Sequence, residues 1–278
     1  MPDDLVQLLR WYADMGVDIA LDAMPHDRTR EPVAPPPGPV RENAEPVKDE
    51  PQRSRAAPLP SAPAALAAPA EAVQQDAREA AASARTLAEL RDHLLAFEGC
   101  GLKATATQLV FGSGEAGAEI MFVGEAPGAD EDRQGVPFVG RTGQLLDKML
   151  ASIGLDRGKV YIANVVPWRP PGNRTPTPIE TAACLPFTRR QIELVAPKIL
   201  VCLGAPSAQT LLNSKEAITR LRGRWFDYAA GDVAIRAIAM LHPAYLLRRP
   251  ADKRLAWRDM RLLAKEIARL RAGSENST

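Results

Sequence analysis

Four acidic side chains follow the apolar run at residues 118–124 within one loop, "GEAPGADEDRQGVPFVG". Glu125 and Asp132 are candidates to position a water molecule or to act as a general base, and Glu131 stands next to Asp132. So much negative charge makes a poor cradle for phosphate groups, and the sequence has no G-x-x-x-x-G-K-[ST] segment. The loop therefore indicates acid–base chemistry and argues against a nucleotide hydrolase.

Two side chains in neighbouring segments could recognise a flat ligand. Phe138 closes the same loop, where an aromatic ring can stack on a planar molecule, although packing in the core is the alternative. Asn164 stands near the end of the apolar run "KVYIANVV". A buried amide must be hydrogen-bonded, so Asn164 could read a donor and an acceptor on a ring, or cap the following loop. Gly124 would let the backbone approach such a ligand closely.

His242 opens the segment "HPAYLLRRP", which follows the last apolar run. A histidine at this place can donate a hydrogen bond to a developing oxyanion. The only other histidines are His26 and His93, so we expect no metal site built from histidines. Leu246 beside Arg248 is suited to wedging into a base stack while phosphates are held.

The segment "NVVPWRPPGNRTPT" at residues 164–177 cannot fold as a helix because prolines interrupt it. Arg169 and Arg174 lie on this rigid loop, where they could meet a phosphate backbone. The same loop places Trp168 between two prolines.

These candidate residues need a scaffold, and the body of the chain alternates strands with helices. We expect strands at 118–124, 159–166, 198–204 and 233–241, and helices at 143–155, 177–195, 205–213 and 251–273. Pro186 should kink or break the second of these helices. The alternation predicts a parallel sheet with helices on both faces. Ligands bind outside the carboxyl ends of such strands, where the candidate residues follow.

The N-terminal part of the chain has a different composition. Residues 1–22 place apolar side chains at spacings of three and four, which is typical of an amphipathic helix. Residues 23–70 hold 12 of the 25 prolines and few large apolar groups, which predicts a disordered linker. The first helix would then be tethered, able to dock on the body or to bind a partner protein. Strong helix formers predict a helical lead-in at 71–98.

Charge is unevenly distributed along the chain. Residues 1–84 carry 8 Lys and Arg against 14 Asp and Glu, whereas residues 85–278 carry 27 against 20. The excess of basic residues in 85–278 favours a polyanionic partner, although a surface that only keeps the protein soluble would give the same pattern. The sequence has neither a run of about 18 apolar residues nor a signal peptide pattern, so we expect a cytoplasmic monomer with no membrane contact. Three scattered cysteines predict no disulfide framework.

Four segments together, "GEAPGADED…PFVG", "NVV…RPPGNRTPTPIE…C", "PKILVCLG" and "HPAYLLR", resemble the family 4 uracil-DNA glycosylases over roughly residues 86–270. The resemblance implies an α/β fold, a three-layer α/β/α sandwich with a central four-stranded parallel sheet. The catalytic domain would occupy 99–273, followed by a tail at 274–278. It also implies that uracil in DNA is flipped into a pocket and its N-glycosidic bond is hydrolysed, since the stacked base cannot be reached.

The resemblance also assigns roles in binding uracil. Phe138 would stack on the base, Asn164 would hydrogen-bond its edge, and His242 would donate to O2 as uracil leaves as an anion. Backbone amides of the loop that begins at Gly124 would stabilise the same anion. Cytosine presents the opposite donor and acceptor pattern, so it would leave the amide mismatched.

Further roles follow from the same resemblance. Glu125 or Asp132 would position the attacking water, and Glu131 would stand where a thymine methyl group would clash. A related branch traps uracil through a histidine that residues 165–184 lack, so we expect an enzyme that turns over. The alternative is a module that binds uracil or abasic sites in DNA with little turnover.

The chain departs from this family at the iron–sulfur cluster. The family usually holds a [4Fe–4S] cluster on four cysteines, of which Cys100 and Cys184 match the second and fourth. Phe97 stands three residues before Cys100, and Trp168 stands sixteen residues before Cys184. Two thiolates cannot hold a cubane cluster in the ordinary way. We therefore expect no cluster and no other cofactor, with Phe97 and Trp168 filling the volume by apolar packing.

Overall fold

The computed structural model describes residues 70–231 and 233–275. The helix expected at 1–22, the linker expected at 23–70 apart from its last residue, and the end of the expected tail at 276–278 lie outside the described residues. None of the described helices combines the length and the apolar character that crossing a membrane requires.

Five strands form one sheet in the order β2-β1-β3-β5-β4. They are β1 (Ile120–Gly124), β2 (Tyr161–Asn164), β3 (Ile199–Leu203), β4 (Trp225–Ala230) and β5 (Val233–Met240). Neighbours among β2, β1, β3 and β5 pair in parallel, which confirms the predicted parallel core of four strands. The register aligns Gly124 with Asn164 and Leu203 with Met240, so the loops after these strands start at one edge.

The fifth strand, β4, corrects the prediction of a purely parallel, four-stranded sheet. It pairs antiparallel with β5 across a turn in which Gly231 has a φ of 58°. It lies at the edge of the sheet, and only two of its six residues are buried. An edge strand of this kind lacks the continuous apolar run that identifies a central parallel strand.

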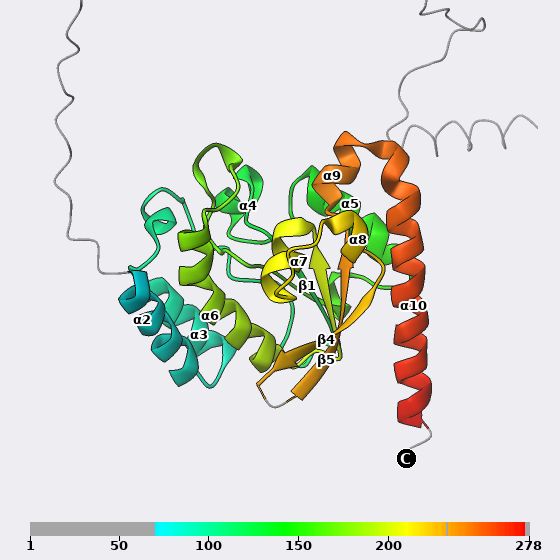
Figure 1. Ribbon diagram of the computed structural model, residues 1–278, viewed down its shortest axis with the longest axis horizontal. Helices are drawn as coiled ribbons and strands as arrows, with labels where there is room; N and C mark the ends of the chain where they lie inside the picture. Colours follow the sequence, from blue (N-terminus) through cyan, green and yellow to red (C-terminus); the bar gives the residue numbers. More distant parts are fainter. Residues whose placement is uncertain (1–69, 232, 276–278) are drawn as a thin grey trace, which may run out of the picture. The chain divides into compact units, whose positions relative to one another are not determined.

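Helices cover both faces of the sheet (Figure 1). One face packs against α2 (Ala70–Ser83), α3 (Leu87–Ala96), α6 (Pro178–Val195) and α7 (Ala205–Leu211), and the other against α5 (Arg141–Ala151), α9 (Pro243–Arg248) and α10 (Lys253–Glu275). Successive side chains of β1 enter opposite cores: Met121 belongs to the first and Phe122 to the second. The predicted three-layer α/β/α sandwich is confirmed. The shorter elements are α4 (Ala129–Gln134), α8 (Ile218–Leu221), η1 (Gly101–Ala104), η2 (Arg157–Lys159), η3 (Pro171–Asn173) and η4 (Pro250–Asp252).

The helix α6 follows the loop after β2 and packs its buried side chains in the core. At its start the Thr177 hydroxyl accepts from the N–H of Glu180 at 3.3 Å, and the Glu180 carboxylate accepts from the N–H of Thr177 at 2.7 Å. The helix continues through Pro186, so the proline does not break it. Buried Cys184 and Phe187 on either side of the proline anchor both halves in the core.

The stretch expected as a helical lead-in consists of two helices, α2 and α3. Thr86 caps the start of α3, and its hydroxyl accepts from the N–H of Glu89 at 3.1 Å. Arg190 of α6 donates to the carbonyl of Ala84 between the two helices, at 3.0 and 2.8 Å. The pair therefore packs against α6 as part of the same compact unit as the sheet.

Candidate active site

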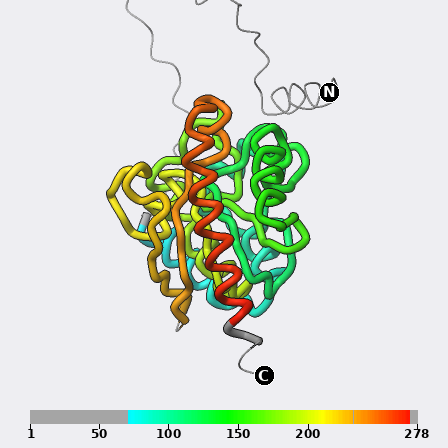
Figure 2. Tube along the Cα trace, turned by 90° about the vertical axis from the view of Figure 1, so that its right-hand side faces the viewer, coloured from blue at the N-terminus to red at the C-terminus, as the bar shows by residue number. Residues whose placement is uncertain are grey.

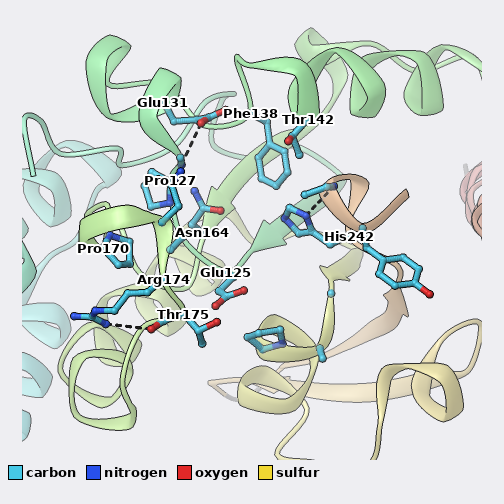
Figure 3. Close-up of a pocket in the computed structure, with 18 of the residues that line it drawn as sticks. Glu125, Pro127, Glu131, Phe138, Thr142, Asn164, Pro170, Arg174, Thr175 and His242 are labelled. Carbon is cyan, nitrogen blue, oxygen red and sulfur yellow. Dashed lines mark hydrogen bonds between the residues drawn. The ribbon is translucent and has the colours of Figure 1, made fainter. Parts of the chain in front are cut away.

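The loops after β1, β2, β3 and β5 enclose a pocket of about 530 Å³ at the carboxyl edge of the sheet. Glu125, Phe138, Asn164 and His242 surround it (Figure 3). The fold thus brings together these four residues, all of which the sequence singled out.

Asn164, the last residue of β2, places a buried amide in this pocket. The side chain is 4% exposed, and Oδ1 has no hydrogen-bond partner among the described residues. A Cβ atom at position 124 would lie 2.5 Å from this oxygen, so glycine is required there to make room for the amide. An unpaired buried acceptor costs about 1–3 kcal/mol. The Oδ1 acceptor of Asn164 is therefore available for a hydrogen bond from a donor on a ligand.

Phe138 is held in the pocket wall by an unusual backbone. Its φ is 56°, a conformation that non-glycine residues rarely adopt, and its side chain is 4% exposed. Arg157 donates to the carbonyl oxygens of Pro137 and Phe138 and is paired with Asp147 at 2.6 Å. A Cβ atom at Gly143 would overlap the Phe138 carbonyl. The ring is therefore packed in the core and is also part of the pocket lining, and its stacking on a flat ligand stays a prediction.

Glu131 lines the pocket, but its carboxylate is occupied by backbone amides. One oxygen accepts from Gly128 at 3.1 Å, and the other from Val139 at 3.0 Å and Gly140 at 3.1 Å. Figure 3 shows the first of these bonds. The carboxylate thus ties the start of α4 to the segment that follows Phe138.

Asp132 does not reach the pocket, which corrects its candidacy for positioning water. It is 3% exposed and accepts from the N–H and the hydroxyl of Thr107 at 2.8 and 2.9 Å and from the N–H of Gln108 at 3.3 Å. One residue along a helix rotates the side chain by about 100°, which turns Asp132 away from the face that carries Glu131. Its role here is to hold the segment before β1.

Glu125 is the other candidate base, and it does line the pocket. Burial raises the pKa of this carboxyl, and a hydrogen bond from the Thr175 hydroxyl partly opposes the shift. Figure 3 shows both side chains on the floor of the pocket below Asn164. A carboxylate with a raised pKa is a better proton acceptor than a solvated one.

His242 stands across the pocket from Glu125 at the start of α9, where its Nδ1 accepts from the N–H of Ala244 at 3.1 Å. Burial, assisted by the charge of Arg248, lowers the pKa of His242 to about 4. The ring is therefore neutral at pH 7. Because Nδ1 is an acceptor, the single proton resides on Nε2. The imidazole centroid lies 5.5 Å from that of Phe138, at an angle of 35°.

Basic side chains stand at the mouth of the pocket. Arg248 and Arg174 both line it. Arg174 forms two bonds with Glu180, at 2.6 and 2.8 Å, and this ion pair lowers the pKa of Glu180 to about 2. Arg169 lies outside the lining, where its Nε donates to Asn173 at 2.7 Å.

The expectation that Leu246 is exposed for contact with DNA is wrong. It is fully buried in the core between the sheet and α10, whereas Leu247 is 36% exposed. α9 is a short helix that packs one side on this core, and only one of two consecutive leucines can face inward. The sequence "YLLRR" does not specify which of the two that is.

Several pocket residues were missed in the sequence. Thr142, Thr175 and Tyr245 all line the cavity. Thr175 and Tyr245 lie inside the segments "PPGNRTPT" and "HPAYLLR", so their proximity to Arg174 and His242 was a usable signal. Thr142 has no such signal, because α5 brings it to the pocket by its packing.

The four positions that match the cysteines of the family's cluster lie in one apolar core region of this chain. Cys100 and Cys184 are buried, with their sulfur atoms 3.6 Å apart and no disulfide between them. Trp168 and Phe97 are buried in the same cluster, and the Phe97 ring packs on Phe187 with centroids 5.1 Å apart. Within residues 70–231 and 233–275, no three His, Cys, Asp or Glu side chains are grouped as metal ligands would be. The donor set present does not fit a four-thiolate cluster.

Comparison with known proteins gives the same picture as the geometry. A family model described as the uracil DNA glycosylase superfamily matches residues 111–261. Type-4 uracil-DNA glycosylases of Archaeoglobus fulgidus and Thermotoga maritima are 47% and 44% identical over 155 residues, which cover 54% and 55% of this chain and 78% and 79% of theirs. One of Sulfurisphaera tokodaii is 38% identical over 188 residues, covering 66% of this chain and 85% of its own. The matched part includes the sheet and the pocket.

Proposed function

The chain belongs to the uracil DNA glycosylase superfamily, and we propose that it excises uracil by flipping the nucleotide out of DNA into the pocket beside Asn164. The enzyme is a uracil-DNA glycosylase: it hydrolyses the N-glycosidic bond and leaves an abasic site for base excision repair. Flipping is required because the bond is inaccessible in the base stack. The observation that carries the proposal is the unpaired, buried Oδ1 of Asn164.

Asn164 reads the edge of the base in this proposal. Its Oδ1 accepts from N3–H of uracil, and its amide nitrogen donates to O4. Cytosine has an acceptor at N3 and a donor at C4, so both contacts would become repulsive once that base filled the pocket. Phe138 stacks on the ring and Glu131 holds the loop that positions Phe138.

His242 stabilises the leaving group. Negative charge develops on uracil as the bond from N1 to the sugar breaks, and Nε2–H donates to O2. The ring acts in its neutral form, as its lowered pKa supports. Gly124 begins the loop whose backbone amides assist the same anion.

Glu125 positions the water that attacks the sugar carbon. Its place in the pocket and its raised pKa support this role over Asp132, which is bound by Thr107 and Gln108. In the reaction the water adds to C1′, its proton passes to the Glu125 carboxylate, and uracil leaves as the anion that His242 stabilises.

No iron–sulfur cluster takes part in this proposal. Cys100 and Cys184 supply two sulfur ligands where a cubane needs four, and Phe97 and Trp168 occupy the remaining positions as packed core residues. Contact with Cys100 and burial raise the pKa of the Cys184 thiol, which favours its protonated form. The monomeric state, the cytoplasmic location and a docking role for residues 1–22 remain predictions.

A test separates excision from binding alone. The protein is incubated with a single-uracil oligonucleotide, and the abasic product is cleaved with alkali and resolved on a gel. We expect strand scission at uracil and none at cytosine or thymine. A mobility shift without scission would support the alternative, a module that binds uracil or abasic sites with little turnover.

A further inference from the structure

One face of α10 carries a row of cations without partners. The row consists of four exposed side chains, Arg254, Arg258, Arg261 and Lys265. Their spacing of four, three and four residues aligns them on one side of the helix. None of the four has an ion-pair or hydrogen-bond partner in the described part of the chain. We call these four residues the α10 basic row.

The charge of the α10 basic row is not neutralised by acids on its own helix. Asp259 points into the protein and pairs with Arg222 at 2.6 Å. Glu266 pairs with Arg269 at 2.7 Å and with Arg236 at 3.6 Å. Some other surface cations, such as Arg174, have acidic partners of their own. A row of free cations on a protein that acts on DNA favours a polyanionic ligand.

An exposed aromatic ring accompanies the row. Trp257 is 48% exposed, although tryptophan is usually largely buried. It lies three residues after Arg254 and one before Arg258, on the same side of the helix. Cations that track a backbone, together with an aromatic ring on which a base can stack, are the chemistry by which proteins hold single-stranded nucleic acid.

The row begins at the rim of the pocket. Tyr245 lines the pocket, and its hydroxyl donates to Asp252 at 2.7 Å, immediately before α10. Figure 2 shows α10 running from α9 along the side of the molecule, in front of the other described elements. From Arg254 to Lys265 the helix rises about 16 Å, the length of roughly five nucleotides of a strand.

We propose that the α10 basic row binds the phosphates of a single-stranded DNA segment flanking the flipped uracil, with Trp257 stacking on an unpaired base. The inference rests on the proposed function and names the kind of substrate that the enzyme holds outside its pocket. A duplex has no free base face for Trp257, so the row distinguishes single-stranded from double-stranded flanks. Residues 1–22, which are acidic, are the competing occupant.

The test compares excision on substrates of two lengths. The variant Arg258→Ala/Arg261→Ala/Lys265→Ala is measured on single-stranded oligonucleotides with two or with ten nucleotides on each side of uracil. A control removes the same charge from α2, α3 and α6 as Arg78→Ala/Arg91→Ala/Arg189→Ala. We expect equal kcat/KM for all three proteins on the short substrate. On the long one the α10 variant should lose at least tenfold, and the control less than twofold.

Two further measurements address the mode of binding. The slope of log Kd against log salt on the long strand should fall by about 2 in the α10 variant, since each phosphate contact on a single strand contributes about 0.7. Trp257→Ala should weaken binding of the long strand about tenfold and leave duplex binding unchanged.

Each contrary result has a distinct meaning. Equal losses on the short and the long substrate, or no loss on either, would overturn the inference while uracil excision itself stands. Faster excision by the α10 variant than by the unchanged protein would mean that the row holds an acidic segment of the chain, and the inference would be wrong. Absence of uracil release from every substrate would instead contradict the proposed function.

Discussion

The sulfur atom of Cys184 lies 3.6 Å from that of Cys100, inside a core cluster that also buries Trp168. Two thiols at contact distance remain where four thiolates would be required for a cubane cluster. The other two positions are taken by aromatic side chains that have no metal-binding atom. This region therefore connects α6 to the segment after α3 through apolar packing.

The first prediction follows directly from this pair. Protein purified without oxygen should contain well under one iron and one acid-labile sulfide per chain. Prolonged treatment with an iron chelator should change neither the melting temperature nor the rate of uracil excision. About four irons per chain, lost together with stability on chelation, would refute the assignment.

Packing of the Trp168 side chain should stabilise the fold in the region where a cluster would otherwise do so. Replacing this 2% exposed side chain by alanine leaves a large cavity, so Trp168→Ala should lower the free energy of unfolding by about 3–5 kcal/mol. Trp257→Ala makes the same chemical change at a 48% exposed site and should cost less than about 0.5 kcal/mol. Urea unfolding of both variants gives the comparison. Similar losses of unfolding free energy in the two variants would show that packing of Trp168 does not stabilise this region.

Asn164 should be needed for excision and dispensable for folding. Asn164→Ala relieves the cost of an unpaired buried acceptor, about 1–3 kcal/mol, and loses some packing, so the free energy of unfolding should not fall. Excision should fall more than 100-fold, because a pocket built to hydrogen-bond its substrate depends on each contact. Binding to undamaged DNA should be nearly unchanged. A rate within tenfold of normal would remove Asn164 from the site.

His242 gives a pH dependence whose sign can be stated. Its pKa falls from 6.5 to about 4 on folding, so the unfolded chain binds the extra proton in that range. The stabilisation from the neutral ring is complete above pH 6.5 and is lost as the pH falls through 4, by up to about 3 kcal/mol.

Urea unfolding at pH 7 and at pH 4.5 isolates this effect when the protein is compared with His242→Gln, because the other titrating groups are common to both. The unchanged protein should lose more stability than the variant. Equal losses would mean that the histidine is not held neutral.

The central sheet could be predicted from the sequence because parallel strands are buried on both faces and leave continuous apolar runs, as in "KILVCLG". Asn164 and His242 were recognisable because each is a polar residue at the end of such a run. The direction in which a side chain points from a short helix could not be predicted from the sequence. Asp132 turns to Thr107 and Leu246 to the core because of tertiary packing, and no local pattern encodes that choice. β4 was missed for the related reason that only part of it is buried.

Arg248 should contribute to DNA affinity through one phosphate. It is exposed at the pocket mouth, and no ion pair holds it among the described residues. Arg248→Ala should therefore raise KM several-fold, leave kcat within about threefold, and reduce the slope of log Kd against log salt by about 0.9 on duplex DNA. The matched change Arg91→Ala on α3, far along the chain from the pocket loops, should alter neither quantity. Since the charge of Arg248 also lowers the pKa of His242, the variant should show a small rise in that pKa. An unchanged salt slope would place the phosphate contact elsewhere on the rim.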